Sequence, residues 1–484
     1  MNLNPQVLRK LDLGSLAQFY FKKFNDGRYL LTNDSGRYCF LNQSQFDKFL
    51  SGKVPPGTAL FNDLKTGGFL KHYLDFNLLS ERWRARHEYL WQATSLHIVV
   101  VTLRCNHHCV YCQTSSEPMD ARNRDMTPET ARRTVDRIFE SPSPAITIEL
   151  QGGEPLANWP AVRTLVRYAR EKNRTAKKKL HLALVTNLSL MDEGKLSFLL
   201  KNEVSLCTSL DGPAAIHNHN RVFLGGSSHA IVVRWWKEIR RRTVRQAFRI
   251  DGLMTTTRFS LAYPEKIVDE YLRRGAYGMY LRLLNPFGFA QKTWAAIGYS
   301  PEEYLVFYRR AMDYILQVNR TRRQFFEQTA RVFLQKILTD EDPGFMDIRS
   351  PCGAGIGQMA YNYDGKVYTC DEGRMLAETG DDSFRLGSVG KTTYAGLAQA
   401  LPVRTLAMAS QLDNQAHCSG CVYKPYCGIC PLCEYAQHGD LFARPSSAQC
   451  RIHMGILDYL FEKMRDAKNK AVFAGWLRKA GRDR

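Results

Sequence analysis

The 484-residue sequence has no long hydrophobic run. No segment comes near the roughly 18 consecutive apolar residues that a membrane-spanning helix needs. The first residues, Met-Asn-Leu-Asn-Pro-Gln, also lack the charged and then apolar pattern of a secretion signal. These two absences exclude a helical membrane protein and predict a soluble, cytoplasmic one.

Cysteine is sparse and unevenly placed. Thirteen cysteines are too few for a disulfide-stabilised scaffold of this length. Eleven of them fall in two groups, at residues 105–112 and 352–450, and only Cys39 and Cys207 stand apart. Clustered cysteines in a chain without a secretion signal favour metal ligation over disulfides. Cys39 and Cys207 are predicted to be small buried hydrophobic residues.

Internal repeats and low-complexity tracts are absent too, so the sequence does not predict a repeat architecture. The net charge of +20 favours an anionic partner, either nucleic acid or an acidic peptide. No nucleic-acid-binding signature accompanies the charge, so nucleic acid is not expected. The alternative, an ordinary solvated basic surface, stays open.

Strand-like apolar runs alternate with helix-length segments over the middle of the chain. A capping residue followed by proline, Thr127-Pro128, begins one of these helices. Six βα units predict an α/β fold with a parallel sheet, closed or partial as a barrel, and a site at the carboxyl ends of its strands. The six runs are Leu96–Leu103, Ile146–Leu150, Leu180–Val185, Val204–Ser209, Phe248–Met254 and Met279–Leu284.

The N-terminal part has a different pattern. Asn25-Asp-Gly27 is a hairpin signal between the strand-like runs 19–23 and 28–32, and a third strand is expected at 37–41. Helical patterns follow at 43–50 and around 60–70, which suits either a winged-helix-like module or an ordinary α+β cap. We expect five parts: an N-terminal α+β peptide-recognition-like module at 1–92, an α/β core at 93–310, a helical connector at 311–350, a cysteine-rich domain at 351–460 and a basic tail at 461–484.

The first cysteine group is the most informative feature of the chain. Cys105, Cys109 and Cys112 have the spacing C-x3-C-x2-C and directly follow the first strand of the α/β core. Three thiolates can hold three irons of a four-iron cluster and leave the fourth iron open to a small molecule. A zinc site completed by a neighbouring histidine is the competing interpretation. Tyr111 is placed either to lie over a flat cofactor or to pack against the strand.

Two further motifs follow later strands of the core. In Gln-Gly-Gly-Glu-Pro, Gly152 and Gly153 allow a ligand to approach the backbone, and Glu154 can accept hydrogen bonds from an ammonium group. Near Ser-Leu-Asp-Gly-Pro, Ser209 and Arg221 could bind a carboxylate or ribose hydroxyls. Each motif taken alone could be a plain turn.

Together these motifs resemble the radical S-adenosylmethionine superfamily over residues 96–310. The resemblance implies a partial, TIM-like (β/α)6 barrel. It also implies a [4Fe–4S] cluster on the three cysteines, whose open iron chelates S-adenosylmethionine. Glu154 and the glycines would hold its ammonium, Ser209 and Arg221 its carboxylate or ribose, and Tyr111 its adenine. One electron from an external donor would release a 5′-deoxyadenosyl radical that abstracts hydrogen from a substrate.

The second cysteine group could ligate two four-iron clusters or two zinc ions. It resembles the SPASM extension of radical S-adenosylmethionine peptide-modifying enzymes, which implies two auxiliary [4Fe–4S] clusters. The resemblance assigns three cysteines to the first cluster and four to the second, while an additional cysteine leaves the fourth ligand of the first cluster open. The first set is Cys352, Cys370 and Cys430; the second is Cys418, Cys421, Cys427 and Cys450; the additional residue is Cys433.

Asp371 directly follows Cys370. It matches a position where some relatives carry a catalytic base, and a carboxylate beside a cluster could take a proton from an oxidised substrate radical. The alternative is an aspartate that only makes structural hydrogen bonds.

The segments 29–41, 60–70, 282–288 and 423–428 resemble the maturases of His-Xaa-Ser systems. This implies a precursor peptide as substrate and a second radical enzyme of the same system as partner. The N-terminal module would then resemble a leader-recognition module, which binds an extended peptide as an added strand. Two other functions stay open: a sulfatase-maturing enzyme that oxidises Cys or Ser to formylglycine, and a zinc-rich adaptor that binds nucleic acid.

Overall fold

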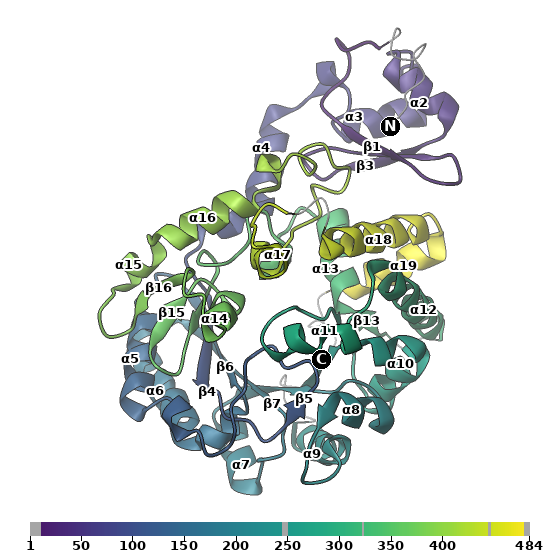
Figure 1. Ribbon diagram of the computed structural model, residues 1–484. Helices are drawn as coiled ribbons and strands as arrows, with labels where there is room; N and C mark the ends of the chain where they lie inside the picture. Colours follow the sequence, from purple (N-terminus) through teal and green to yellow (C-terminus); the bar gives the residue numbers. More distant parts are fainter. Residues whose placement is uncertain (1–10, 244–249, 322–323, 444–446, 479–484) are drawn as a thin grey trace.

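The computed structural model describes residues 11–243, 250–321, 324–443 and 447–478. Its centre is a nine-stranded sheet with the strand order β12-β10-β8-β7-β6-β4-β14-β15-β16. Figure 1 labels β4, β6 and β7 in the middle of this sheet and β15 and β16 at one edge. The six strands from β4 to β12 run parallel. Because β12 ends the sheet and β14 takes the other side of β4, the six strands form a partial barrel, as expected from the sequence. They are β4 (Leu96–Thr102), β6 (Ala145–Gly152), β7 (Lys179–Thr186), β8 (Val204–Ser209), β10 (Ile250–Thr255) and β12 (Leu281–Arg282).

The last two expected strands differ from the structure in detail. The start of the fifth run, at 248–249, lies outside the described residues. The sixth run is divided at Tyr280 into two short strands with different partners: β11 (Gly278–Met279) pairs with β13 (Phe326–Glu327), whereas β12 pairs with β10. One apolar run thus serves two sheets, which its sequence pattern does not reveal.

Helices cover the outer face of the six parallel strands (Figure 1). On β6 the buried residues Ile146, Ile148 and Leu150 alternate with less buried ones, since successive side chains of a strand point to opposite faces. The prediction from Thr127-Pro128 is confirmed, because Thr127 caps the helix and accepts a hydrogen bond from the Thr130 N–H. The helices are α5 (Pro128–Phe139), α6 (Trp159–Ala176), α7 (Glu193–Lys201), α8 (Ala214–Asn220), α9 (Ser228–Thr243) and α10 (Pro264–Arg273).

The cysteine-rich region extends the same sheet beyond β4. Strand β14 (Gln358–Tyr361) runs parallel to β4, with Gln358 opposite Leu96, and two antiparallel strands follow it. The second cysteine group is thereby attached to the strand that leads into the first. The remaining elements here are β15 (Lys366–Tyr368), β16 (Arg385–Ser388), α14 (Asp371–Glu378), α15 (Tyr394–Ala398), α16 (Leu401–Ser410) and α17 (Pro431–His438).

Four further helices close the side of the barrel opposite this extension (Figure 1). Tyr308 of α12 packs edge-on against Tyr459 of α18, and Phe333 of α13 against His453. The expected division at residue 461 falls inside α18, and the described part of the expected tail includes the packed helix α19. Residues 479–484 lie outside the described residues. The four are α12 (Pro301–Arg320), α13 (Gln328–Leu338), α18 (Ala448–Lys463) and α19 (Ala467–Leu477), and α11 (Phe289–Ile297) precedes them.

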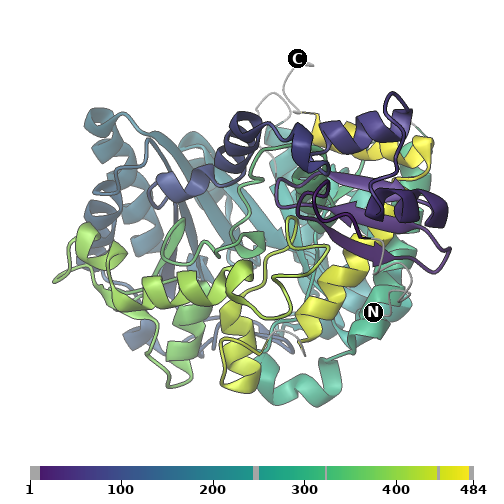
Figure 2. The same cartoon turned by 90° about the horizontal axis from the view of Figure 1, so that it is seen from above.

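The N-terminal part forms a three-stranded antiparallel sheet with the order β1-β2-β3, which confirms the expected hairpins. One face of this sheet packs with two helices into a small hydrophobic cluster of its own. The other face lies over α18 and the loop before α17 (Figures 1 and 2). The elements are β1 (Tyr20–Lys23), β2 (Tyr29–Thr32), β3 (Tyr38–Leu41), α2 (Gln43–Leu50) and α3 (Ala59–Thr66), and α4 (Phe76–Arg86) leads to the barrel.

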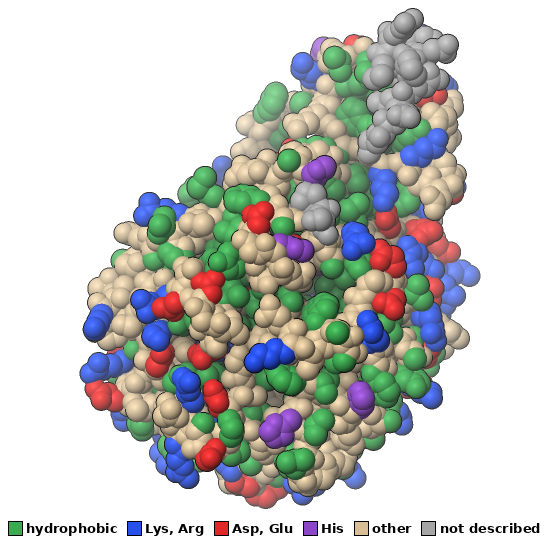
Figure 3. Space-filling model, viewed as in Figure 1, with side chains coloured by type: hydrophobic (Ala, Val, Ile, Leu, Met, Phe, Trp, Pro, Cys, Tyr) green, Lys and Arg blue, Asp and Glu red, His purple; other side chains and the backbone are tan. Residues whose placement is uncertain are grey.

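Within the described ranges, no helix is both long enough and apolar enough to cross a membrane. On the face shown in Figure 3, hydrophobic side chains gather toward a hollow near the middle, while lysines and arginines are spread around it.

Replacing Trp476 with alanine tests whether α19 is part of the core. Trp476 is 2% exposed, and its indole N–H donates to Oδ1 of Asn319 on α12. Its removal leaves a cavity, so the stability of the helical layer should fall by about 3–5 kcal/mol in denaturant unfolding. Trp91, which is 83% exposed, is the matched control, and its replacement should change stability by less than about 0.5 kcal/mol. Equal effects of the two changes would contradict a packed role for α19.

Candidate functional site

The first cysteine group lies on the loop that leaves β4 at its carboxyl end. The Cys105 N–H donates to the Glu117 carbonyl at 2.9 Å, and Cys109 pairs with Arg221 through the short strands β5 (His108–Cys109) and β9 (Arg221–Val222). Burial raises the pKa of the Cys105 thiol, and the neighbouring Cys109 and Cys112 raise it further. The three predicted cysteines therefore face a common space.

The three thiols of this loop have different surroundings. Burial raises the pKa of Cys109 to about 11. At Cys112 burial acts in the same direction, but hydrogen bonds from Ser116 and Thr114 outweigh it and lower the pKa. The Cys112 sulfur lies 3.3 Å from the Ser116 hydroxyl and 3.4 Å from that of Thr114. These hydroxyl groups stabilise a thiolate at this position.

The donor set fits a four-iron cluster, since three thiolates face one space on one loop. Thiolates that share such a cluster bind different corners and lie farther apart than the ligands of a single ion. Across the described ranges, no group of three or more His, Cys, Asp and Glu side chains has the arrangement of a site for a single metal ion.

The two glycines that follow β6 lie against the backbone at the start of the cysteine loop. A Cβ on Gly152, whose φ is +150°, would lie 2.1 Å from the Thr102 carbonyl oxygen. A Cβ on Gly153 would lie 2.4 Å from the carbonyl oxygen of Arg104. The Gly153 N–H donates to the Thr102 carbonyl at 2.9 Å. The atoms nearest to these glycines belong to the backbone of residues 102–104. Both glycines are therefore required for backbone packing, with or without a bound ligand.

Glu154 is fully buried, and its carboxylate binds protein groups. It accepts hydrogen bonds from the Leu156 N–H at 3.0 Å, the Thr186 hydroxyl at 2.7 Å and the Asn187 N–H at 2.8 Å. Burial raises its pKa, while these bonds stabilise the charged form. Glu154 thus ties the ends of β6 and β7 together, and a contact with an ammonium group stays a prediction.

Tyr111 and Arg221 meet in a buried cluster with a residue that the sequence reasoning missed. The Tyr111 hydroxyl donates to Asp211 at 2.7 Å and accepts from Nε of Arg221 at 2.9 Å. Asp211 has no exposed surface, and burial raises its pKa while Arg221 lowers it. Its position in the Ser-Leu-Asp-Gly motif, at a strand end, was the available signal. Ser209 lies nearby at the end of β8, and its hydroxyl has no hydrogen-bond partner in the part of the chain that the structure describes.

Two buried histidines, His107 and His217, form a second hydrogen-bond network. His107 is one of the histidines that the zinc interpretation considered as a ligand, and the structure gives it hydrogen-bond partners of its own. Within hydrogen-bond distance, His107 contacts the Asn187 side chain at 3.0 Å and the Ser228 hydroxyl at 2.9 Å. The same hydroxyl lies 2.9 Å from His217. Burial lowers the pKa of His107 to about 3, so this ring is neutral. The network connects the cysteine loop to the ends of β7 and to α8 and α9.

The second cysteine group separates into two sets in space. Cys352, Cys370, Cys430 and Cys433 are all buried in one cluster. Cys430 precedes the first turn of α17 and Cys433 lies within it, so their three-residue spacing places both on the same side of the helix. The structure therefore brings the additional cysteine next to the other three.

The second set comes from a loop and a helix. Burial raises the pKa of the Cys427 thiol, and the charges of Cys421, Cys450 and Cys418 raise it further. These are the four residues that the resemblance grouped together. Three of them lie within residues 418–427, which we call the ligand loop, and Cys450 is in the first turn of α18.

Charged side chains without ion-pair partners lie inside the barrel, next to the first of these sets. A pocket is lined by Tyr280, Arg282, Asp347 and Glu372 together with Cys430 and Cys433. Among the described residues, neither Arg282 nor Glu372 forms an ion pair. Burial raises the pKa of Glu149 on β6 to about 7, and nearby Asp371 adds to the shift.

Asp371 itself begins α14, and Nε of the fully buried Arg374 donates to it at 2.8 Å. Within the part of the chain that the structure describes, the Nη atoms of Arg374 have no hydrogen-bond partner. Asp371 therefore lies between the barrel interior and the first set, and one of its oxygens already has a structural partner. Its predicted role as a base stays a prediction.

Residues 99–270 match the family model of the Radical SAM superfamily. A cysteine-type anaerobic sulfatase-maturating enzyme from Clostridium perfringens is 24% identical over 388 residues, covering 78% of this chain and 98% of that protein. Among solved structures, native anSMEcpe with bound AdoMet has a TM-score of 0.64 at 20% identity, over 78% of this chain and all of that one. Streptococcus suis SuiB bound to precursor peptide SuiA has a TM-score of 0.54 at 13% identity, over 90% of this chain and 99% of that one. These likenesses confirm the predicted fold.

Replacing Gly153 with alanine tests the contact between β6 and the cysteine loop. The added methyl group would clash with backbone oxygens, and overpacking of this kind costs typically about 1–3 kcal/mol. We expect lower thermal stability and less iron bound after anaerobic reconstitution. Gly194, in the first turn of α7, is the control, because a Cβ there meets nothing closer than 3.4 Å. If both variants bind iron like the unchanged protein, the loop does not depend on this contact.

Proposed function

We propose that this protein, whose residues 99–270 match the family model of the Radical SAM superfamily, is an enzyme that uses S-adenosylmethionine to modify a peptide. The observation that carries this proposal is the placement of the barrel interior. The segment after β12 connects the two cysteine sites there: Leu284 packs in one cluster with Cys109 and Tyr111. Phe287 packs in the buried cluster that contains Cys352, Cys370, Cys430 and Cys433. A substrate held there would have one cysteine site on either side.

In this proposal Cys105, Cys109 and Cys112 hold a [4Fe–4S] cluster with S-adenosylmethionine on its open iron. When bound, this pair supplies a one-electron cleavage that yields a 5′-deoxyadenosyl radical. The electron comes from an external donor. The protein contributes the orientation of both groups and a site that excludes water.

Several residues around the loop are free to bind S-adenosylmethionine. Only Nε of Arg221 has a hydrogen bond within the described residues, so its two Nη groups can bind a carboxylate or ribose. The Ser209 hydroxyl is likewise available. Tyr111 is held by Asp211 and Arg221, which fixes the ring in one orientation for contact with the adenine. Glu154 acts mainly by fixing the loop ends from which Gly152 and Gly153 present their carbonyl groups.

We assign two auxiliary [4Fe–4S] clusters to the two cysteine sets. Cys433 completes the first set as its fourth thiolate, since it lies beside Cys430 on α17. A set of four thiolates leaves no iron open, which favours electron transfer over substrate binding. Asp371, between this set and the barrel interior, is the candidate base for a proton released when the substrate radical is oxidised.

The substrate that we propose is a precursor peptide of the His-Xaa-Ser type, with a second radical enzyme as partner. SuiB, whose structure contains the precursor peptide SuiA, has the same fold over 90% of this chain. The three-stranded N-terminal sheet supports a leader-binding role, because each outer strand has one edge on which a peptide strand could add.

Oxidation of a Cys or Ser side chain to formylglycine is the second candidate function. One observation supports it as strongly as the likeness to SuiB supports the first candidate. The sulfatase-maturating enzyme from Clostridium perfringens aligns over 98% of its own length. Its alignment covers 78% of this chain. The third possibility, a zinc-rich adaptor that binds nucleic acid, has no support from these comparisons.

Replacing Cys112 with alanine tests the central assignment. One ligand of the first cluster is lost, so cleavage of S-adenosylmethionine by the reduced protein should fall at least about a hundredfold, as expected when a metal site is lost. The unchanged protein should bind about twelve irons per chain in three clusters, and the variant should keep the roughly eight irons of the two auxiliary clusters. Production of 5′-deoxyadenosine measures the first quantity and iron analysis the second. Cys39→Ala, at a cysteine outside all three sets, is the control. Retained cleavage in the Cys112 variant would count against the assignment.

The mass of the modified peptide distinguishes the two candidates. The reduced enzyme is incubated with S-adenosylmethionine and either a His-Xaa-Ser peptide or a peptide carrying a sulfatase Cys motif. A cross-link or desaturation in the first peptide removes two hydrogens, whereas formylglycine in the second gives an aldehyde that reacts with a hydrazine probe. We expect the first product. An aldehyde in the second peptide alone would establish the alternative.

A further inference from the structure

The five residues between Cys421 and Cys427 are in contact with elements outside the ligand loop. Two of these contacts reach the N-terminal sheet directly. The Thr32 hydroxyl, at the end of β2, donates to the Val422 carbonyl at 2.7 Å. The Tyr426 hydroxyl donates to the Gly36 carbonyl, in the β2–β3 turn, at 3.1 Å. Both bonds are buried, so water does not replace them easily.

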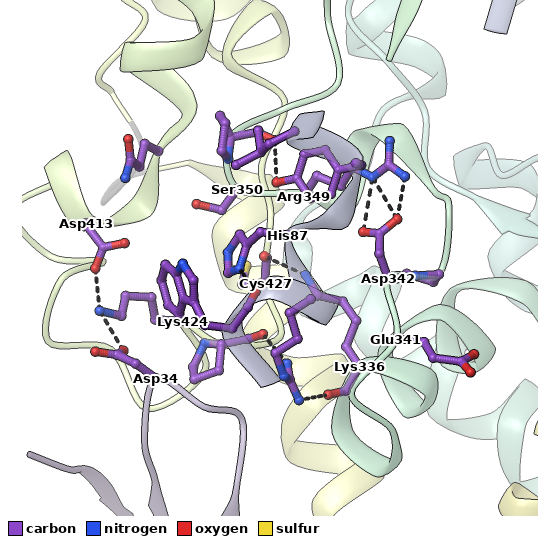
Figure 4. Close-up of a pocket in the computed structure, with 18 residues that line it drawn as sticks. Asp34, His87, Lys336, Glu341, Asp342, Arg349, Ser350, Asp413, Lys424 and Cys427 are labelled. Atoms are coloured by element: carbon purple, nitrogen blue, oxygen red, sulfur yellow. Dashed lines mark hydrogen bonds and ion pairs between the residues drawn. The ribbon is translucent and has the colours of Figure 1, made fainter. Parts of the chain in front are cut away.

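Lys424 is the centre of this contact. Its ammonium group donates to the Tyr20 hydroxyl at 2.8 Å, and it pairs with Asp34 at 2.9 Å and Asp413 at 2.5 Å. Figure 4 shows Lys424 between the two carboxylates, one from the N-terminal sheet and one from the cysteine-rich region. Only 9% of Lys424 is exposed. Burial alone would lower its pKa, but the two carboxylates and Tyr20 raise it instead, so the lysine stays charged.

Lys22 of β1 connects the N-terminal sheet to α18, the helix that carries Cys450 of the second set. Its ammonium group binds both oxygens of Asp458 on α18, at 2.7 and 2.8 Å. The Tyr423 hydroxyl donates to the same carboxylate. Tyr38 of β3 adds an edge-on contact with Phe461. The N-terminal sheet therefore contacts both the ligand loop and the helix that carries the fourth cysteine.

These contacts matter because the ligand loop consists of turns and contains no helix or strand. Local turns with few regular backbone bonds open more easily than helices or strands, so outside contacts decide how well they are held. On the other side of the loop, the Lys336 ammonium group donates to the Cys427 carbonyl at 3.0 Å. A pocket lined by Asp34, Lys424, Lys336 and Cys427 lies between these two supports (Figure 4).

We propose that the N-terminal sheet is a clamp that holds Cys421 and Cys427 in position for the second auxiliary cluster. The clamp acts through Thr32, Asp34 and Lys22, which are positioning residues and do not touch the cluster or the substrate. This inference rests on the proposed function, since it takes the second set to be a cluster site.

The test compares Thr32→Val combined with Asp34→Asn against a matched pair of changes in the same module. The control is Lys23→Gln combined with Asp47→Asn, because the contacts of these side chains among the described residues stay within the module: both contact Gln43, and Lys23 also lies over the Tyr29 ring. Hydrogen exchange of residues 418–427 is measured in the full chain, before and after anaerobic reconstitution. In the reconstituted protein, the rate of iron release to a chelator and the reduction potentials of the clusters are measured as well.

We expect exchange in the ligand loop to rise about tenfold in the first variant, since one buried hydrogen bond and one partly exposed ion pair are lost. About four irons per chain should be released faster, and one reduction potential should shift. Cleavage of S-adenosylmethionine without peptide should stay within about twofold of the unchanged protein, because the Cys105–Cys112 loop is untouched. The control should match the unchanged protein in every measurement.

Unchanged exchange and iron release in the first variant, with the module still folded by circular dichroism, would overturn the clamp and leave the proposed function intact. If the double change unfolds the module, Thr32→Val alone, which is nearly isosteric, provides the same comparison. Failure of the unchanged protein to bind about twelve irons would instead contradict the proposed function. The exchange measurement on the protein as purified still decides whether the sheet holds the loop.

Discussion

The close contact between two backbone segments is the constraint on which the first site depends. The chain at residues 102–104 passes so near Gly152 and Gly153 that no side chain fits between them. Hydrogen bonds from Gly153 and Glu154 to the carbonyls of Thr102 and Arg104 hold the segments together. Because the cysteine loop begins at the same point, its path is determined by the end of the neighbouring strand. The Gly152-Gly153 motif, which the sequence suggested for close approach of a ligand, therefore first determines the position of the cysteine loop.

Buried charge is the second constraint, and buried charged side chains have different surroundings in two regions of the protein. Around the cysteine loop every buried charge has a partner: Asp211 with Tyr111 and Arg221, and Glu154 with three donors. In the barrel interior, Arg282 and Glu372 lack ion-pair partners among the described residues. Leaving a buried charge unpaired is costly. In the second region the opposite charges of Arg282, Glu372 and Asp347 still influence one another, but at distances longer than those of an ion pair.

The order of strands in the sheet explains how three cysteine sets come to lie in one molecule. Strand β14 adds to β4 and continues the barrel sheet into the cysteine-rich region. This brings α14, with Cys370 and Asp371 at its start, over the barrel interior near Glu149. The N-terminal sheet then covers the ligand loop from outside. Each set is thus supported by an element distant from it in sequence.

The sequence by itself determined the local features: the alternation of strands and helices, the N-terminal hairpins, the cap at Thr127, and the cysteine spacing. Such features depend on neighbouring residues and on periodicity, so a single chain reveals them. Only the tertiary structure decided that Cys433 joins Cys352, Cys370 and Cys430. It also decided how the run near Tyr280 divides between two sheets, and that Asp211, His107 and Lys424 have partners far along the chain. Those outcomes depend on long-range packing and on the burial of charge. A linear pattern can mark a position, as the Ser-Leu-Asp-Gly motif marks Asp211, but it does not reveal the distant partner.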